Sequence, residues 1–258
     1  MIGYMDTHCH LANPRLIGQV AAVIARANRA GVDTIICATA HIEECRQAAD
    51  LAGRYPGVYC LAGIHPHDAR LAGEGYLDRL AELAANPRMV AIGETGLDYH
   101  YDHSPRDRQR KVFAAQLELA GRLGKPVIVH TREAFDDTLA ILADSPVPPQ
   151  RVVLHSFSEG PGGAGRALAL GMTLSFSGIV TFANAGYLRE SARLAPDDRI
   201  LTETDAPFLS PEPVRKMKTN EPANVVHVAA ALARLRGQTL RHLAACVRQN
   251  AQRVFGIS

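Results

Sequence analysis

The sequence predicts an α/β protein with a (β/α)8 TIM barrel, and two features of the chain lead to this prediction. Eight short apolar segments alternate with longer stretches of helical periodicity along the 258 residues. Short runs in which nearly every residue is apolar are typical of parallel strands that are covered on their outer face. Eight strand–helix units in about 250 residues match the size of such a barrel.

The predicted strands are the segments in which this apolar pattern is densest, at residues 2–7, 34–38, 58–63, 89–94, 127–130, 152–155, 172–176 and 200–204. Helices are predicted at residues 16–30, 42–54, 76–85, 106–123, 134–143, 222–235 and 239–254. Gly31 and Gly124 are placed to end two of these helices, and Ser104 is expected to cap one of them ahead of Pro105. Residues 160–163 are rich in glycine and predict a flexible turn.

The alternative fold is an open, doubly wound sheet, which usually has a glycine-rich phosphate loop after its first strand. Residues 7–16, which follow that strand here, contain no glycine. Neither a linker nor a repeat interrupts the chain. We therefore expect residues 1–258 to form a single barrel domain.

The amino-acid composition limits which binding partners and which cellular compartment we expect. The formal net charge is only +2, from 28 basic and 26 acidic side chains, which argues against a protein that coats nucleic acid by bulk electrostatics. The five cysteines include no CxxC pair, which favours a reducing cytosol. We see no secretory signal and no run of roughly 18 apolar residues. We expect a cytoplasmic protein that needs neither a membrane nor an obligatory protein partner.

Metal-capable side chains lie at the predicted ends of most strands. In a β/α barrel these ends open onto one face, where active sites are built. Residues far apart in the sequence are therefore expected to converge there. The candidates are His8, His10, His65, His67, Glu94, His130, His155 and Asp205.

One histidine at a strand end is more often a hydrogen-bonded loop residue than a ligand, but the joint pattern favours a metal centre. His8, His10 and Glu94 can hold one cation, and a second set can hold another while Glu94 bridges the two; that second set is His130, His155 and Asp205. Two cations about 3.5–4 Å apart can bind a hydroxide between them as the nucleophile. Magnesium, manganese and zinc are the candidate metals, and the sequence does not choose among them.

Because side chains alternate between the two faces of a strand, their positions indicate which residues can support the metal ligands. Asp6, His8 and His10 share one face, whereas Cys9 points away from it. Asp6 lies one layer deeper, where it can orient a ligand. Glu203 shares parity with Asp205, and it is either a residue that orients a ligand or a solvated residue after a bend.

Six segments of the chain resemble, in order, the signature blocks of the TatD family of metal-dependent deoxyribonucleases, which are amidohydrolase-type barrels. They are MDTHCHL, AGIHPHD, AIGETGLDYH, KPVIVHTREA, VLHSFSEG and ETDAPFLSP with NEPANV. This resemblance implies two divalent metals and hydrolysis of DNA phosphodiesters, often as a 3′-to-5′ exonuclease. By the same resemblance Glu94 is shared by the metals, Asp205 binds metal and takes a proton from the attacking water, and His65 approaches the substrate phosphate.

The expected mouth of the site offers several candidate substrate contacts. Arg132 and Lys218 lie on loops there and can bind phosphate. The chain has no tryptophan, and this scarcity of stacking surfaces favours a narrow site for DNA ends. The nearby aromatic residues are Tyr99, Tyr101, Phe157 and Phe208. Residues 214–222 are one residue longer than the family pattern and lack its glycine, which leaves the contacts of this loop open.

The leading hypothesis from the sequence is thus a two-metal deoxyribonuclease that acts on DNA ends. The first alternative is an amidohydrolase-type esterase or amidase that cleaves a small substrate or an aminoacyl-RNA ester. The second is a barrel that uses the same face for binding only.

Overall fold

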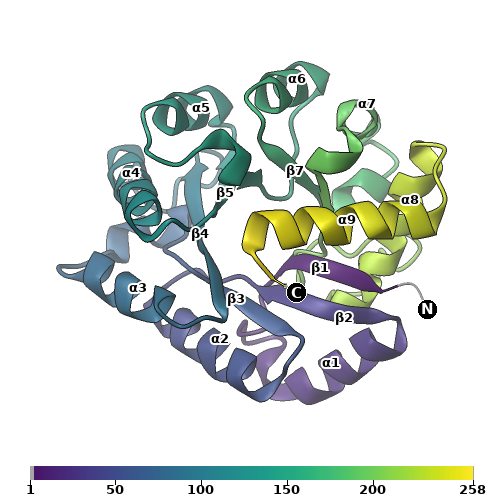
Figure 1. The fold of residues 1–258 in the computed structure, drawn as a ribbon, viewed down its shortest axis with the longest axis horizontal. Helices are drawn as coiled ribbons and strands as arrows, with labels where there is room; N and C mark the ends of the chain where they lie inside the picture. The colour runs from purple at the N-terminus through teal and green to yellow at the C-terminus, as the bar shows by residue number, and fades with distance from the viewer. Residues whose placement is uncertain (1–2, 258) are drawn as a thin grey trace.

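The computed structural model describes residues 3–257 and confirms the predicted barrel. Its parallel strands follow one another round one sheet in chain order, as Figure 1 shows. They are β1 Tyr4–Cys9, β2 Val32–Cys37, β3 Val58–Ala62, β4 Met89–Asp98, β5 Val127–Arg132, β6 Val152–Leu154, β7 Thr173–Phe176 and β8 Ile200–Thr202.

The first and last strands meet beyond the end of β8. The amide of Asp205 donates to the carbonyl of His8 at 2.9 Å, and the amide of His10 donates to the carbonyl of Ala206 at 2.7 Å. These bonds nearly close the barrel. They also place the segment after β8 directly beside the two histidines of β1 and its end.

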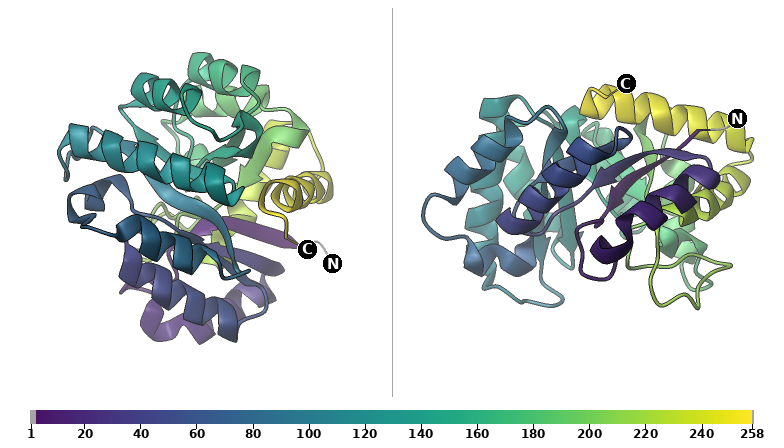
Figure 2. Two further views of the ribbon diagram at one scale, coloured as in Figure 1. Left: turned by 60° about the vertical axis from the view of Figure 1, so that its left-hand side comes forward. Right: turned by 90° about the horizontal axis from the view of Figure 1, so that it is seen from below.

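An outer layer of helices surrounds the strands (Figures 1 and 2). They are α1 Val20–Arg29, α2 Ile42–Arg54, α3 Tyr76–Ala84, α4 Arg106–Leu123, α5 Phe135–Ala143, α6 Pro161–Ala169, α7 Gly186–Leu194, α8 Val225–Leu235 and α9 Leu240–Phe255. Short 3-10 turns lie at Ile17–Gln19, Pro66–Leu71, Pro149–Arg151, Gly178–Thr181, Asp197–Arg199 and Pro222–Asn224. Among residues 3–257, no helix is both long and apolar enough to cross a membrane.

Several predicted strand ends are wrong: β1, β4 and β5 continue past residues 7, 94 and 130, whereas β8 stops two residues short, at Thr202. Glu94 and His130 therefore lie inside strands, with β4 ending at Asp98 and β5 at Arg132. Gly96 allows this continuation: it has a φ of +140°, and a Cβ built on it would lie 2.0 Å from the carbonyl oxygen of His130. Residue 2 of the first predicted strand lies outside the described residues.

The prediction of a turn at residues 160–163 is also wrong. Pro161 occupies the first turn of α6, where its missing N–H costs no helical hydrogen bond. Ala164 and Ala167 are fully buried on the same helix face. Packing of this face against the barrel outweighs the low helix propensity of the glycines. Helix α7 was not predicted either, although Leu188 and Ala192 bury an apolar face there at a spacing of four.

Ser104 does not cap α4, contrary to prediction, because Pro105 is the N-cap. The Ser104 hydroxyl instead donates to the carbonyl of His67 at 2.7 Å and accepts from the amide of Arg70 at 3.0 Å. It thereby joins the loops that follow β3 and β4. The expected glycine after this helix is confirmed, since Gly124 is left-handed with a φ of +61°.

Two fully buried glutamines on α4 hold the ends of β3 and β4. The side chain of Gln109 accepts from the amide of Asp98 at 2.8 Å and donates to its carbonyl at 3.1 Å. Gln116 accepts from the amide of Ile64 at 2.8 Å and donates to the carbonyl of that residue at 3.0 Å. The helix thus supplies the backbone partners that the strands lack at these points.

Replacing Gln116 with leucine is expected to destabilise the fold by about 2 kcal/mol or more, because the buried amide and carbonyl of Ile64 lose these side-chain partners. Urea unfolding measures the change in the free energy of unfolding. The matched control is Gln252→Leu on α9, where the side chain is exposed; its effect should stay within about 0.5 kcal/mol. Equal stability of the two variants would contradict the role of Gln116.

Candidate metal centre

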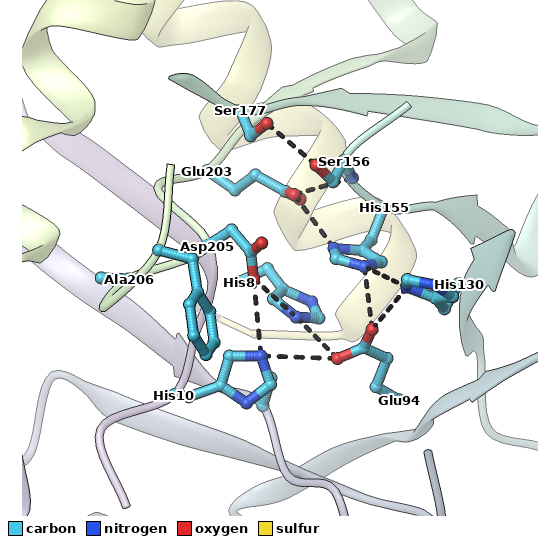
Figure 3. A network of polar contacts seen from close by, with 12 residues as sticks. His8, His10, Glu94, His130, His155, Ser156, Ser177, Glu203, Asp205 and Ala206 are labelled. Atoms are coloured by element: carbon cyan, nitrogen blue, oxygen red, sulfur yellow. Dashed lines mark hydrogen bonds and ion pairs between the residues drawn. The ribbon is translucent and has the colours of Figure 1, made fainter. Parts of the chain in front are cut away.

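The predicted ligands converge on one carboxylate at the barrel end where the strands terminate (Figure 3). Glu94, with a side chain only 2% exposed, lies at the centre. Its Oε2 atom faces Nε2 of His8 at 3.1 Å and Nε2 of His10 at 3.5 Å. Its Oε1 atom faces Nδ1 of His130 at 3.1 Å and Nε2 of His155 at 2.9 Å. The two oxygens therefore serve two different sets of imidazoles.

Asp205 contacts the first of these sets and also clusters with His8 and His155, since the ligand atoms of these three residues lie within 4.8 Å of one another. Its Oδ1 atom lies 3.5 Å from Nε2 of His10 and 3.9 Å from Nε2 of His8. The sequence analysis grouped Asp205 with the second set. The bonds that join the end of β1 to the segment after β8 explain the placement, because they bring Asp205 alongside His8.

His65 reaches the same centre from the loop after β3. Its Nε2 atom lies 3.2 Å from Oε1 of Glu94. Its Nδ1 atom accepts a hydrogen bond from the amide of His67 at 3.1 Å, so the ring proton of the neutral imidazole is carried on Nε2. The residue therefore presents an N–H donor to the centre.

The donor chemistry fits a divalent cation better than a hydrogen-bonded cluster. A carboxylate offers about four acceptor sites, yet the oxygens of Glu94 face five imidazole nitrogens at 2.9–3.5 Å. Nδ1 of His130 and Nε2 of His155 also face each other at 3.3 Å. Two atoms that bind one cation at about 2.0–2.2 Å lie roughly 3.0–3.5 Å apart. Three sets of three residues in this centre each bring their ligand atoms within 4.8 Å of one another: His8 with His155 and Asp205, His8 with His10 and Glu94, and His65 with Glu94 and His130.

The electrostatics of the centre are dominated by burial and by the contacts between imidazoles and carboxylates. Burial alone would raise the pKa of Glu94, but the neighbouring histidines, His155 first, hold it well below its usual range. Burial lowers the pKa of His65 to about 4 and also lowers that of His8. The Glu94 carboxylate and the uncharged imidazole of His8 are the forms that bind metal, and the uncharged imidazole of His65 is the form that donates through Nε2–H.

Glu203 contacts His155 on the side of the ring opposite Glu94. Its Oε1 atom accepts from Nδ1 of His155 at 3.1 Å and from the amide of Ser156 at 2.7 Å, as Figure 3 shows. Ser175 donates to the other oxygen. The carboxylate thus orients the imidazole so that Nε2 faces Glu94. Of the two sequence interpretations, the contacts favour the one in which Glu203 orients a ligand.

Asp6 supports the centre through the backbone. It is fully buried and accepts from the amide of Thr204 at 2.9 Å, from the Thr204 hydroxyl and, at 3.4 Å, from the amide of His8. Burial raises the pKa of Asp6 to about 8. The residue therefore ties β1 to the segment that carries Asp205 and does not touch an imidazole ring in these contacts.

Asp98 is a buried residue of this centre that the sequence analysis did not identify. Its Oδ2 atom accepts from Nε2 of His130 and from Nε2 of His67, both at 3.0 Å. These hydrogen bonds lower the pKa of Asp98 although burial opposes them. The bond to His130 directs Nδ1 of that ring toward Glu94. Strand parity offered the signal, because Asp98 is four residues beyond Glu94 on the same strand.

Replacing Asp98 with alanine is expected to weaken metal affinity or activity by about 10–100-fold, since the carboxylate fixes the orientation of His130. Metal titration of the purified variant measures the affinity. The control is Asp102→Ala in the following loop, because Asp102 is exposed and pairs with Arg106. If both variants bind metal as tightly as the wild type, Asp98 does not orient His130.

The two predicted phosphate-binding residues lie at the same end of the barrel, although Arg132 is the last residue of a strand and not part of a loop as predicted. Arg132 is half-buried at the end of β5, and its Cζ atom lies 4.7 Å above the ring of Tyr101. Lys218 is exposed on the loop after β8. Its neighbour Thr219 accepts a hydrogen bond from Arg15 at 3.2 Å, which brings this loop beside the segment after β1.

A parallel barrel with imidazoles and carboxylates gathered at its carboxyl end defines a class of protein, the metal-dependent hydrolases. Residues 5–256 match the family described as TatD related DNase, and the chain belongs to that family. The resemblance and the predicted enzyme class, a metal-dependent hydrolase acting on ester bonds, are thereby confirmed.

Relatives and a solved structure agree with this membership. The chain is 41% identical over 256 residues to the uncharacterized metal-dependent hydrolase YcfH of Escherichia coli K12, a match that covers 98% of this chain and 96% of YcfH. It is 36% identical over 239 residues to the 3′-5′ ssDNA/RNA exonuclease TatD of Klebsiella pneumoniae, covering 91% of each. The crystal structure of the E. coli TatD homologue YjjV superposes with a TM-score of 0.93 at 31% identity, covering both chains fully.

Proposed function

We propose that the chain, as a single barrel domain, is a two-metal phosphodiesterase that degrades single-stranded DNA from its 3′ end. The observation that carries this proposal is the arrangement of Glu94, whose two oxygens face separate sets of imidazoles. A carboxylate shared in this way suits two cations bridged by one residue. The relative named as a 3′-5′ ssDNA/RNA exonuclease supports the substrate class and the polarity.

The ligands divide by their contacts. His8, His10 and Asp205 would hold one cation, His130 and His155 would hold the second, and Glu94 would be common to both. When bound, divalent cations polarise the phosphoryl oxygens and activate water for attack on phosphorus. Imidazole and carboxylate donors are compatible with magnesium, manganese or zinc.

The remaining chemistry belongs to protein groups. Asp205 presents a carboxylate that is 14% exposed and can accept the proton released by the attacking water. His65 presents its Nε2–H to the centre and can donate to a phosphate oxygen. Glu203 keeps the His155 ring in place while these groups act. Arg132 and Lys218 would bind phosphates outside the centre.

Product analysis on labelled single strands tests this proposal. A 5′-labelled strand of DNA incubated with the metal-loaded protein should yield a ladder that shortens from the 3′ end, whereas a strand blocked at its 3′ end should persist. A panel of small carboxylic esters and an aminoacyl-RNA ester is assayed beside it. If an ester is cleaved rapidly while the DNA stays intact, the nuclease proposal is wrong and the same centre is that of an esterase. Inactivity on every substrate would favour a binding protein.

A further inference from the structure

Two exposed aromatic rings, each with an arginine against it, lie beside the metal centre. Tyr101, 51% exposed, has Cζ of Arg132 at 4.7 Å from its ring centroid. Phe208, 45% exposed, has Cζ of Arg15 at 5.8 Å. Of the aromatic residues expected at the mouth, Phe157 is buried in the core and Tyr99 is half-buried. Tyr101 and Phe208 therefore supply the exposed ring surface, and at Tyr101 the ring of His103 extends it, stacked 5.4 Å away.

The two pairs adjoin different sides of the centre. The ring of Phe208 lies 6.0 Å from that of His10, which faces Oε2 of Glu94. The ring of Tyr101 lies 5.5 Å from that of His67, whose ring is in turn 4.4 Å from His65 on the Oε1 side.

Neither guanidinium is neutralised. Among residues 3–257, no carboxylate lies within 4.0 Å of the guanidinium nitrogens of Arg15 or Arg132. The arginines stacked on Tyr99 differ in this respect, because Arg106 pairs with an aspartate at 2.8 Å and Arg110 also contacts one. A guanidinium that stacks on a ring keeps its N–H donors at the edge, where they can bind an anion.

We propose that these two pairs are nucleotide subsites on either side of the scissile phosphate, an inference that rests on the proposed function. At each subsite the aromatic ring stacks on a nucleobase and the arginine binds the nearest phosphate, which for the 3′-terminal nucleotide is the scissile phosphate itself. Stacking and phosphate contacts of this kind tolerate any base sequence. The substrate is therefore an unpaired strand that spans the centre, with an ordered nucleotide on each side of the cleaved bond.

The experiment compares Tyr101→Leu and Phe208→Leu with Tyr187→Leu, which removes an exposed tyrosine on α7. The first readout is kcat/KM for a single-stranded oligonucleotide divided by kcat/KM for bis(4-nitrophenyl) phosphate, a phosphodiester without bases. The second readout is binding without cleavage. An oligonucleotide with 2-aminopurine near its 3′ end is titrated in chelator, and stacking on a ring quenches its fluorescence.

The ratio should fall about tenfold in Tyr101→Leu and in Phe208→Leu, and either variant should weaken binding and reduce quenching by a similar factor. Tyr187→Leu should match the wild type in both readouts. If both test variants keep the wild-type kcat/KM ratio and the wild-type quenching, the proposed subsites are wrong. The proposed nuclease function is unaffected by that result. A wild-type protein that hydrolyses neither phosphodiester would overturn the proposed function itself, and the subsites with it.

Discussion

Replacing Glu94 with alanine should reduce kcat on DNA by about 10³-fold or more, because the variant loses the carboxylate common to both cations. The same change leaves five imidazoles round a space that has lost its central anion and keeps only the Asp205 carboxylate at one side, so the attraction for a second divalent cation falls as well. We therefore expect the metal content of the purified variant to fall together with its activity.

The measurements are turnover on a labelled single strand and metal content by elemental analysis. The matched control is Glu190→Ala on α7, where the glutamate is exposed; this variant should keep wild-type activity and metal. Circular dichroism checks that the barrel forms in each protein. Full activity in Glu94→Ala would refute the shared-carboxylate mechanism.

The second large effect is expected for Asp205→Asn, which keeps the size of the side chain but removes its charge. The amide cannot accept the proton of the attacking water, and it binds a cation more weakly than a carboxylate does. Loss of a general base costs about 10²–10⁴-fold, so kcat should fall within this range. Because Glu94 and the five imidazoles remain, the variant should still bind divalent metal.

This separation of turnover from metal binding distinguishes Asp205 from Glu94. Metal titration followed by turnover at saturating metal measures both quantities in one preparation. The control is Asp144→Asn, an exposed aspartate just after α5, which should behave as the wild type. A fully active Asp205→Asn protein at saturating metal would exclude the residue from proton transfer.

Much of the fold could be predicted from the sequence, because nearly every residue of a buried parallel strand is apolar. The runs around Ile36, Leu61, Ile92 and Val129 are apolar on both faces, since one face meets the barrel interior and the other the helices. Polar residues that follow such runs had to lie at the carboxyl end. His8, His155 and Asp205 could therefore be predicted to lie together from the topology alone.

The errors arose where tertiary contacts outweigh local pattern. The glycines of α6 obscured a helix whose existence depends on buried Ala164 and Ala167. The true ends of β4 depend on Gln109 and Gln116, which reach it from a helix later in the chain.

The most direct test of the central claim is a titration of metal-free protein with manganese, followed by hydrolysis of a single-stranded DNA end. Two cations that share Glu94 predict no activity in the metal-free protein and a rise that reaches its plateau at two equivalents per chain. Full activity in the metal-free protein, or a plateau at one equivalent, would contradict a two-metal centre.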